Sequence, residues 1–296
     1  FELIVCDNAS TDETREIVAD FRDFRIRYIR NHNNIGVAAN WINAVQQATG
    51  EYCAIIGDDD RWHPTFLQRM LEPLVQDINI DIAFCDHWLI NAAGDVLSDL
   101  THTYSKAYGR ADLKPGLHKP FLATILPTQL ICHAAALMRR ESLMASGALN
   151  PRAGRVIDYY SFMQLALAGK GAFYIPERLA YYRIHPESSS AHFQLQVWRD
   201  MQWVCAELLR QNPVGVTARR LRGVFSKAIT SEGFALLREK DRWGAMRTFG
   251  RVLRMTPLRV RPWLGLGLSL FPNHWRRYLN YTASFAENVE LKSAEV

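Results

Sequence analysis

The first half of the chain alternates short apolar runs with segments that carry apolar residues at helical spacing. Apolar or alternating runs at residues 1–6, 25–29 and 52–56 are typical of β-strands. Between them, apolar residues recur every three to four positions from about Glu13 and from Val37 to Ala48, which predicts two helices. This β-α-β-α-β order predicts an α/β fold, with a mostly parallel sheet, right-handed crossovers and flanking helices, the layout of nucleotide-binding domains.

The same alternation continues with weaker signals as far as residue 185. We expect one helix to begin at Thr65 and another near Asp158, the second ending before Gly169. Ser98 to Lys119 shows neither period and is expected to be a loop. The remaining apolar runs are expected to be strands or buried segments, at residues 81–88, 130–138, 172–175 and 180–185, with a turn at 176–179.

From about residue 193 the pattern becomes purely helical. Apolar residues recur at three-to-four spacing in three segments, 193–209, 216–237 and 242–255. The charge changes at about the same point: residues 1–195 carry a net charge of −4, whereas the remainder carries +9 and five of the eight tryptophans. We therefore divide the chain into an α/β domain at residues 1–192 and a basic α-helical region at residues 193–296.

The composition is that of a globular protein with a sizeable core, since 48% of the 296 residues are apolar. The longest apolar run, Trp263 to Phe271, has about half of the roughly 20 residues that a membrane-spanning helix needs. Five cysteines without CxxC spacing favour reduced thiols in a cytoplasmic protein, and neither a disulfide framework nor a zinc site. Because Phe1 already lies within an apolar run, we interpret the chain as a fragment or a processed form.

Three adjacent carboxylates, Asp58 to Asp60, follow the apolar run of residues 52–56, and Trp62 and Pro64 end the segment. Like charges repel unless something neutralises them. Mg²⁺ and Mn²⁺ prefer such hard oxygen ligands and bridge readily to phosphate oxygens. Ligands also bind at the carboxyl ends of strands in α/β sheets. The stretch therefore predicts a metal and phosphate site, and a solvated acidic turn is the alternative.

Three further residues have both a chemical and a structural interpretation. Asp7, at the end of the first strand, could accept hydrogen bonds from a base or a ribose, or it could form an Asx turn or helix cap. Asp158 begins a helix, where it could act as a positioned base or as an N-cap. His185, at the end of the last strand, could contact phosphate or a metal, or serve only the fold.

Taken in order, these residues resemble a known family. The stretches that carry the resemblance are Asp7-Asn-Ala-Ser-Thr-Asp12, Asn34-Ile-Gly36, Gly57-Asp-Asp-Asp60, the helix start at Asp158, and Tyr182-Arg183-Ile-His185. Their order and spacing resemble the family 2 nucleotide-sugar glycosyltransferases. The resemblance covers residues 1–190, and it implies the GT-A fold, a Rossmann-like α/β domain.

The resemblance also implies a donor site. Asp7 matches the family's base-binding aspartate, and Asn34 and Gly36 would belong to the same nucleotide site. The Asp58–Asp60 triplet matches the DXD region, which holds Mg²⁺ or Mn²⁺ on the nucleotide diphosphate. Within it we expect Asp58 and Asp60 to hold the metal and Asp58 and Asp59 to face the nucleotide. His185 matches a histidine near the phosphates and is expected to be a further metal ligand.

On the acceptor side, Asp158 matches the general base that deprotonates the acceptor hydroxyl for in-line inversion at the sugar. Two positions depart from the family's pattern: Ile157 stands where a Glu-Asp pair usually has its Glu, and Gly57 stands where many members place the first Asp of DXD. The family's opening strand and its Pro-Thr-Tyr-Asn-like turn do not occur in the sequence. We therefore expect an N-terminally truncated domain, impaired as given.

Our leading hypothesis is an inverting, metal-dependent glycosyltransferase of the hexosyltransferase type. It would move a sugar from a UDP-, GDP- or dTDP-linked donor to a glycan or a lipid-linked acceptor in cell-surface polysaccharide synthesis. A non-catalytic scaffold with a degenerate transferase domain is the second hypothesis, and a nucleotidyltransferase is the third.

The basic tail raises a separate question of location. Arginines alternate with Trp and Leu from Arg259 to Phe271, which predicts peripheral contact with an anionic membrane and hence a cytoplasmic protein at the cytoplasmic membrane face. An ordinary basic helix packed on the catalytic domain is the alternative. Nucleic-acid binding is not expected, because the arginines belong to no recognisable motif and have no aromatic platform behind them.

Overall fold

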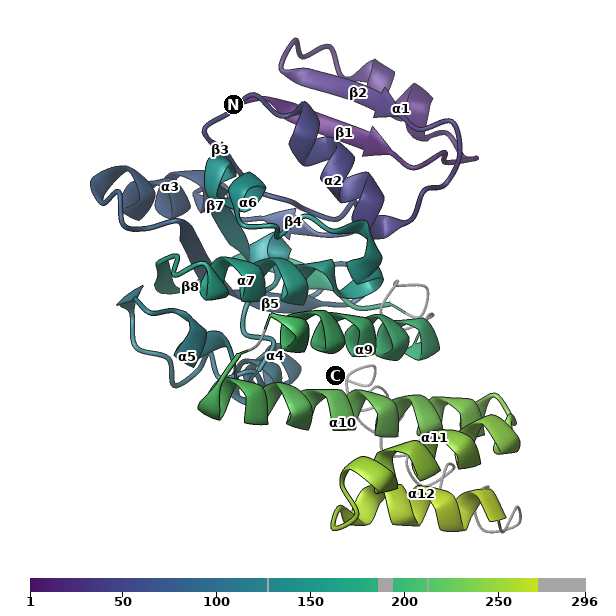
Figure 1. Cartoon of the computed structure of the whole chain (residues 1–296). Helices are drawn as coiled ribbons and strands as arrows, with labels where there is room; N and C mark the ends of the chain where they lie inside the picture. Colours follow the sequence, from purple (N-terminus) through teal and green to yellow (C-terminus); the bar gives the residue numbers. More distant parts are fainter. Residues whose placement is uncertain (127, 186–193, 212, 271–296) are drawn as a thin grey trace. The chain divides into compact units, whose positions relative to one another are not determined.

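The structure is a computed structural model of the chain and describes residues 1–126, 128–185, 194–211 and 213–270. The chain divides into two compact units, Phe1–Ser188 and Ser189–Val296 (Figure 1). The domain boundary that we expect between residues 192 and 193 falls outside the described residues.

The first unit begins with a two-stranded parallel sheet. β1 (Leu3–Asp7) pairs with β2 (Ile26–Arg30) over all five residues, so the carboxyl ends of the two strands lie side by side. The strands are joined through α1 (Thr14–Asp20), and α2 (Val37–Gln47) follows β2. This order is the predicted one.

A second and larger sheet has the strand order β3-β7-β5-β8-β4, and β6 pairs with β8. Within the described residues, β5 and β8 are its one parallel pair, and its four other pairings are antiparallel. The α/β fold is confirmed, but the sheet is mixed, because short strands add to it in the antiparallel sense. The strands are β3 (Tyr52–Cys53), β4 (Arg61–Trp62), β5 (Ile82–Ile90), β6 (Gly116–His118), β7 (Ala136–Arg139) and β8 (Ala172–Arg183).

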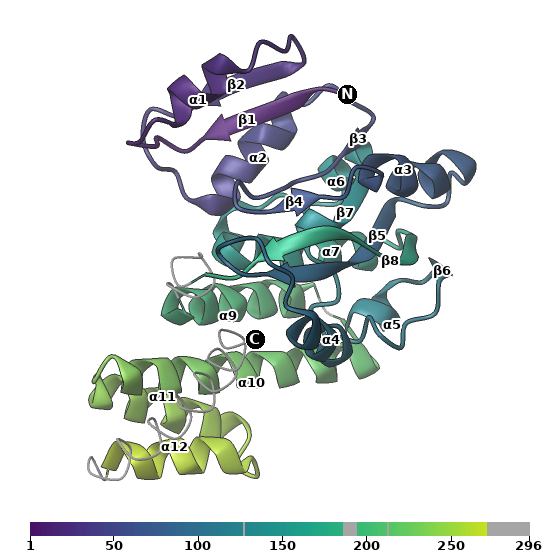
Figure 2. The same cartoon turned by 180° about the vertical axis from the view of Figure 1, so that it is seen from behind.

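β8 is one continuous strand where the sequence predicts two strands and a turn (Figure 2). The register with β5 shifts at Asp86: Cys85 lies opposite Ile175, but His87 lies opposite Ala180. β8 therefore accommodates extra residues in a bulge. Pro176 follows directly after the last regular pair, where its missing N–H does not interrupt the ladder.

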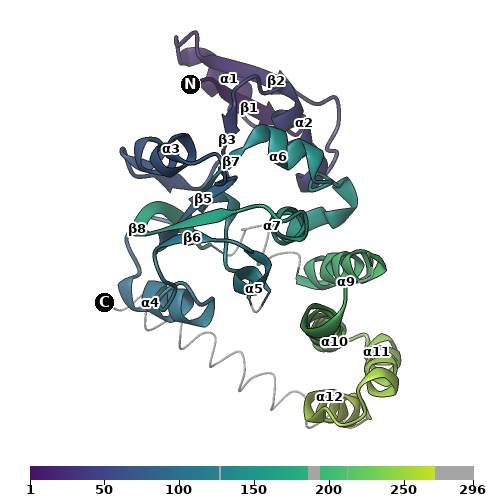
Figure 3. The ribbon, with the colours of Figure 1, turned by 60° about the vertical axis from the view of Figure 1, so that its left-hand side comes forward.

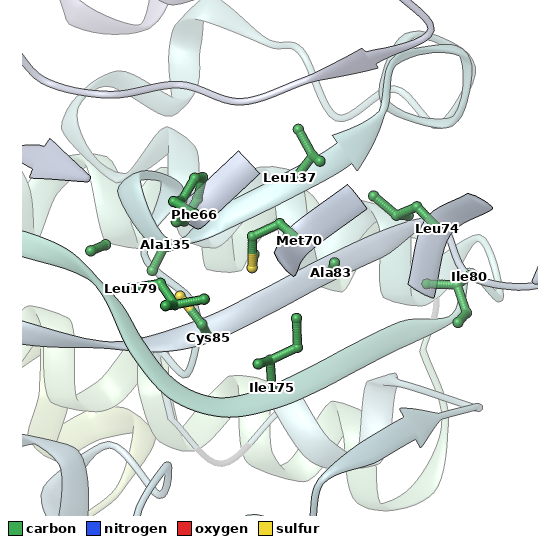
Figure 4. Close-up of a cluster of buried hydrophobic side chains, with 11 residues drawn as sticks. Phe66, Met70, Leu74, Ile80, Ala83, Cys85, Ala135, Leu137, Ile175 and Leu179 are labelled. Carbon is green, nitrogen blue, oxygen red and sulfur yellow. The ribbon is translucent and has the colours of Figure 1, made fainter. Parts of the chain in front are cut away.

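One hydrophobic core cluster of this unit lies between the larger sheet and α3 (Phe66–Gln76). Phe66, Met70 and Leu74 recur every four residues, and each is at most 1% exposed. Figure 4 shows these side chains directed toward strand residues, among them Cys85 of β5 and Ile175 of β8. This packing holds fixed the strands from which the candidate site projects.

Residues 98–119, expected to be a loop, contain a helix and β6. The buried residues of that helix are Thr101 and Ser105, so it lacks the apolar stripe by which a helix is recognised in a sequence. The helices of this region are α4 (Ser98–Ala107), α5 (Leu122–Ile125), α6 (Arg140–Ala145) and α7 (Ile157–Leu167), with 3-10 turns η1 (His133–Ala135) and η2 (Pro151–Val156).

The described part of the second unit is helical, as predicted, and Figure 3 views its helices nearly end-on. The fully buried Phe249 contacts two glycines: an added Cβ would come within 2.6 Å of its ring at Gly233 and within 2.3 Å at Gly265. These glycines let the neighbouring helices approach the ring. No helix within residues 194–211 and 213–270 has the length and apolar character needed to cross a membrane. The helices are α9 (Gln194–Arg210), α10 (Gly215–Arg238), α11 (Arg242–Met255) and α12 (Val260–Leu270).

Candidate active site

The three adjacent carboxylates form a tight turn between β3 and β4. The strand before the turn is shorter than predicted: β3 ends at Cys53, and residues 54–57 run on without a ladder partner, because β7 pairs with β3 at two residues only. The amide of Asp60 donates to the carbonyl of Gly57 at 3.3 Å and closes the turn. A Cβ at Gly57 would lie 2.7 Å from Oδ1 of Asp59, so a glycine leaves room for that carboxylate.

The end of β8 holds this acidic turn from the other side. The amide of Arg183 donates to Oδ1 of Asp60 at 2.9 Å, and its Nε donates to the carbonyl of Asp59 at 2.7 Å. The same guanidinium donates to the carbonyls of Asn91 and Ala92. Nε2 of His185 lies 3.1 Å from Oδ2 of Asp59. The structure thus brings together two stretches that are more than a hundred residues apart in the sequence.

The acidic turn carries more negative charge than its neighbours neutralise. Burial raises the pKa of Asp60 to about 7, and the charges of Asp59 and Asp58 add to the rise, while the amide of Arg183 opposes it. Asp58 is exposed. Oxygen donors under mutual repulsion fit a divalent cation chemically. In the described part of the chain, however, no three His, Cys, Asp or Glu side chains are already grouped to hold one.

Asp158 lies in the first turn of α7, after the N-cap residue Val156. It is therefore not the N-cap, which was the structural alternative. Oδ2 accepts a hydrogen bond from Nε2 of Gln129 at 2.6 Å, and Oδ1 accepts one from the amide of Tyr159 at 2.7 Å. Burial raises the pKa of this carboxyl to about 6, although both hydrogen bonds oppose the rise. A carboxylate with this pKa is largely ionised at pH 7 and can accept a proton.

The Cys132 thiol is affected by the charges of both Asp158 and the acidic turn. Burial raises the pKa of this thiol to about 12, and the charges of Asp158 and Asp60 add to that rise. The two carboxyls are therefore both within electrostatic reach of one thiol. The next residue, His133, packs between Trp41 and Phe162, with ring centroids 5.0 and 4.9 Å away.

Asp7 has different surroundings. Its side chain has no exposed surface, the amide of Ser10 donates to Oδ1 at 2.8 Å, and the hydroxyl of Tyr28 donates to Oδ2, which also lies 3.5 Å from Nε of Arg30. Burial raises the pKa of this carboxyl, but the two hydrogen bonds and the Arg30 charge outweigh burial, so the pKa lies below its ordinary value. Ser10 is three residues after Asp7, one more than in an Asx turn, so the carboxylate caps its own loop in the manner of an N-cap side chain. The predicted contact with a base or a ribose stays a prediction.

A network of asparagine side chains joins the ends of β1 and β2 to the start of α2. Oδ1 of Asn34 accepts hydrogen bonds from the amide of Gly36 and from Nδ2 of Asn8, both at 2.9 Å. Nδ2 of Asn31 donates to Asn40, whose own Nδ2 donates to the carbonyl of Cys6. The predicted nucleotide residues Asn34 and Gly36 thus belong to an ordered loop whose side-chain amides bond one another.

Sequence reasoning did not identify all the residues that shape the site. Gln129 was missed because nothing in its neighbourhood marks it as a partner of Asp158, 29 residues away. Cys132 was missed because an isolated cysteine without CxxC spacing does not indicate a place beside two carboxyl groups. The role of Arg183 as a clamp on the acidic turn was also missed, although the stretch from Tyr182 to His185 did carry a signal.

Comparison with known proteins agrees with this geometry. The profile of the family "Glycosyl transferase family 2" matches residues 1–147. A beta-1,3-glucosyltransferase of Escherichia coli, named for UDP-Glc and alpha-D-GlcNAc-diphosphoundecaprenol, is 30% identical over 109 residues, 36% of this chain and 43% of the relative. A putative teichuronic acid biosynthesis glycosyltransferase of Bacillus subtilis is 30% identical over 104 residues, 34% of this chain and 41% of the relative. The chain thus spans less than half the length of either relative.

Two solved structures share the fold. Staphylococcus aureus TarS, residues 1–349, superposes with a TM-score of 0.59 and 17% identity, over 87% of this chain and 72% of that one. A mannosyltransferase of Pyrobaculum calidifontis, solved in complex with GDP-Man and Mn²⁺, superposes with a TM-score of 0.53 and 16% identity, over 99% of this chain and 78% of that one. With its mixed sheet, its strand-end acidic turn and the match to the family profile, the chain belongs to glycosyl transferase family 2 and has the GT-A fold.

Proposed function

We propose that the protein transfers a sugar from a nucleotide-diphosphate donor to a glycan or lipid-linked acceptor, with inversion at the sugar. The observation that carries this proposal is the acidic turn, which Arg183 and His185 hold by hydrogen bonds. Asp60 of this turn and Asp158 both act electrostatically on the Cys132 thiol, which supports a single site that contains both carboxyl groups. One acidic group would serve the donor and the other the acceptor.

On the donor side, Asp58 and Asp60 would hold Mg²⁺ or Mn²⁺, and Asp58 and Asp59 would face the nucleotide. Such a cation neutralises negative charge that develops on a diphosphate leaving group. A cation at this position would favour the ionised form of Asp60, whose pKa burial raises to about 7. His185 contacts Asp59, so it would have to exchange that partner to serve as a metal ligand. Manganese in the Pyrobaculum neighbour supports divalent-metal use in this fold.

On the acceptor side, Asp158 would remove the proton of the attacking hydroxyl. Its pKa of about 6 leaves it ionised near neutral pH while keeping it a stronger base than an ordinary aspartate. The hydrogen bond from Gln129 would fix the orientation of the carboxylate. General-base catalysis of this kind contributes typically about 10²- to 10⁴-fold to the rate.

The relatives support a role in cell-surface polysaccharide synthesis. One is named for a diphosphoundecaprenol-linked acceptor and another for teichuronic acid biosynthesis. We extend these names to the present chain as a proposal: its acceptor is lipid-linked, and the protein works at the cytoplasmic face of the membrane.

The donor site is tested by calorimetric titration of UDP and GDP into the protein, with and without Mn²⁺. Binding that requires the metal and is lost in Asp58→Ala/Asp60→Ala would support the assignment. The control variant Asp20→Ala/Asp112→Ala makes the same change in net charge at two exposed positions elsewhere. It should bind the nucleotides as the unmodified protein does. If UDP, GDP and, in the same assay, dTDP all fail to bind with or without metal, the transferase proposal fails and a non-catalytic scaffold becomes the better account.

A further inference from the structure

The second unit contains a basic hollow between α10 and α12. Lys227, Thr230 and Ser231 line it from α10, Arg261 lines it from the start of α12 and Arg259 from just before that helix, around a volume of about 300 Å³. The three α10 residues share one helix face, because they are three and four positions apart. The hollow therefore presents cations from α10, from the start of α12 and from the residue before it, and hydroxyl-bearing residues from α10 alone.

The cations of this hollow are not neutralised by any described residue. Nearby acidic charge is used elsewhere: Glu232 pairs with Arg199 at 3.0 Å and with Arg251 at 3.2 Å. Nη2 of Arg259 lies over α10, 3.6 Å from the place where a Cβ of Gly223 would be. Three positive side chains around one opening repel one another, and an anion between them would relieve that repulsion.

Exposed apolar side chains lie on and next to the lining of the hollow: Val260 lines it, and Leu258 and Trp263 flank the lining residues in the sequence. We call these three residues the apolar rim. Leu258 is 95% exposed, Val260 is 78% exposed and Trp263 is 54% exposed, and these residues alternate with the two arginines. Leaving large apolar side chains in water is unfavourable. Tryptophan and aliphatic side chains beside arginine are the combination that lies stably in the interfacial layer of a bilayer.

We propose that this hollow binds the phosphate head group of an anionic membrane phospholipid, with Leu258, Val260 and Trp263 in the interfacial layer. Lys227, Arg259 and Arg261 supply the charge, and Ser231 supplies a hydroxyl. A soluble phosphate would account for the cations but not for the exposed apolar rim. The site does not depend on the transferase reaction, since it lies within the second unit and could operate in a protein without that activity.

The test is co-sedimentation of the protein with vesicles of phosphatidylcholine, with and without phosphatidylglycerol, at physiological salt. Each cation near an anionic surface contributes about fivefold to partitioning. Lys227→Ala/Arg259→Ala/Arg261→Ala should therefore weaken binding to the anionic vesicles by about 100-fold. The matched variant Arg219→Ala/Arg220→Ala/Arg247→Ala removes three exposed cations that do not line the hollow and should weaken binding less than about fivefold.

Two additions complete the test. Leu258→Ser/Val260→Ser should weaken vesicle binding about tenfold while the cations remain, because it removes apolar surface from the rim. Titration with inorganic phosphate separates a lipid site from a general anion site. If the two triple variants lose vesicle binding equally, the attraction is unspecific and the proposal is overturned. Calorimetric binding of inorganic phosphate without any binding to anionic vesicles would also overturn the proposal. Unchanged circular dichroism is expected in all variants, since the altered side chains are exposed.

Discussion

Asp7 and Asp158 are both predicted site residues, but their surroundings shift the pKa values of the two carboxyl groups in opposite directions. Around Asp7, an amide, a hydroxyl and a guanidinium outweigh the effect of burial and lower the pKa. Around Asp158, burial outweighs two hydrogen bonds and raises the pKa to about 6. Burial acts on both carboxyl groups, and both accept hydrogen bonds at each oxygen, but within the described residues only Asp7 also has a guanidinium, that of Arg30, beside it to stabilise the ionised form. The difference separates an aspartate that is held in its ionised form from a candidate base.

The largest expected effect is that of Asp158→Asn. The amide keeps the shape of the side chain but cannot accept a proton, so turnover should fall by about 10²- to 10⁴-fold. The dissociation constant of the nucleotide should remain unchanged, because Asp158 lies outside the predicted donor residues. Steady-state kinetics and calorimetry measure the two quantities. Turnover at the unmodified level would eliminate Asp158 as the base.

Asp7→Ala tests how much the Asp7 carboxylate stabilises the fold. It leaves the Tyr28 hydroxyl and the Ser10 amide without their acceptor, so the free energy of unfolding should fall by about 3 kcal/mol. Asp7→Asn retains an acceptor oxygen and should cost about 1 kcal/mol. Urea unfolding measures both changes. A variant of full stability that no longer binds nucleotide would show that the family's base-binding role, and not the turn, is the main task of Asp7.

His133 offers a test of the packing beside the site. Neither ring nitrogen has a hydrogen-bond partner within the described part of the chain, and burial lowers the pKa of this histidine to about 3. The folded protein therefore resists protonation, while the unfolded chain takes up a proton below about pH 6.5. Stability must fall as the pH falls through this window, by up to about 1.4 kcal/mol per pH unit.

His133→Phe should remove this contribution and keep the aromatic packing with Trp41 and Phe162. Between pH 7 and pH 5 the unmodified protein should lose about 2 kcal/mol more stability than the variant. Urea midpoints at the two pH values measure the difference. Parallel losses in both proteins would mean that the imidazole is solvated or hydrogen-bonded in solution.

The sequence predicts the parts of this molecule that depend on local pattern. The amphipathic helices of the second unit lie within two residues of their predicted limits, and α11 spans the predicted residues 242–255. The α4 helix escaped prediction because its inward residues, Thr101 and Ser105, are held by hydrogen bonds to Leu89 and Asp86 and not by an apolar stripe. Partners of this kind are invisible to periodicity.

Long-range pairing explains the other differences. The run at residues 52–56 has the composition of a strand. Only its first two residues form one, because β7 pairs with it at those two positions alone. In the same way, the acidic triplet and the helix start at Asp158 could be identified from their types and order. The hydrogen bond of Gln129 could not, because it depends on how the loop before η1 lies against the start of α7.

Gln129→Ala has the smallest expected effect and tests the comparison most finely. Its amide N–H stabilises the ionised form of Asp158, so its removal should raise the pKa of the base above about 6. Water can replace part of the bond at this half-buried site, so we expect a rise of about half a unit to one unit. Because the base must be ionised, the acidic limb of the pH–rate profile should move to higher pH: turnover falls several-fold at pH 6 and hardly changes at pH 8. A loss that is equal at both pH values would assign Gln129 to holding the acceptor, with no part in setting the pKa of Asp158.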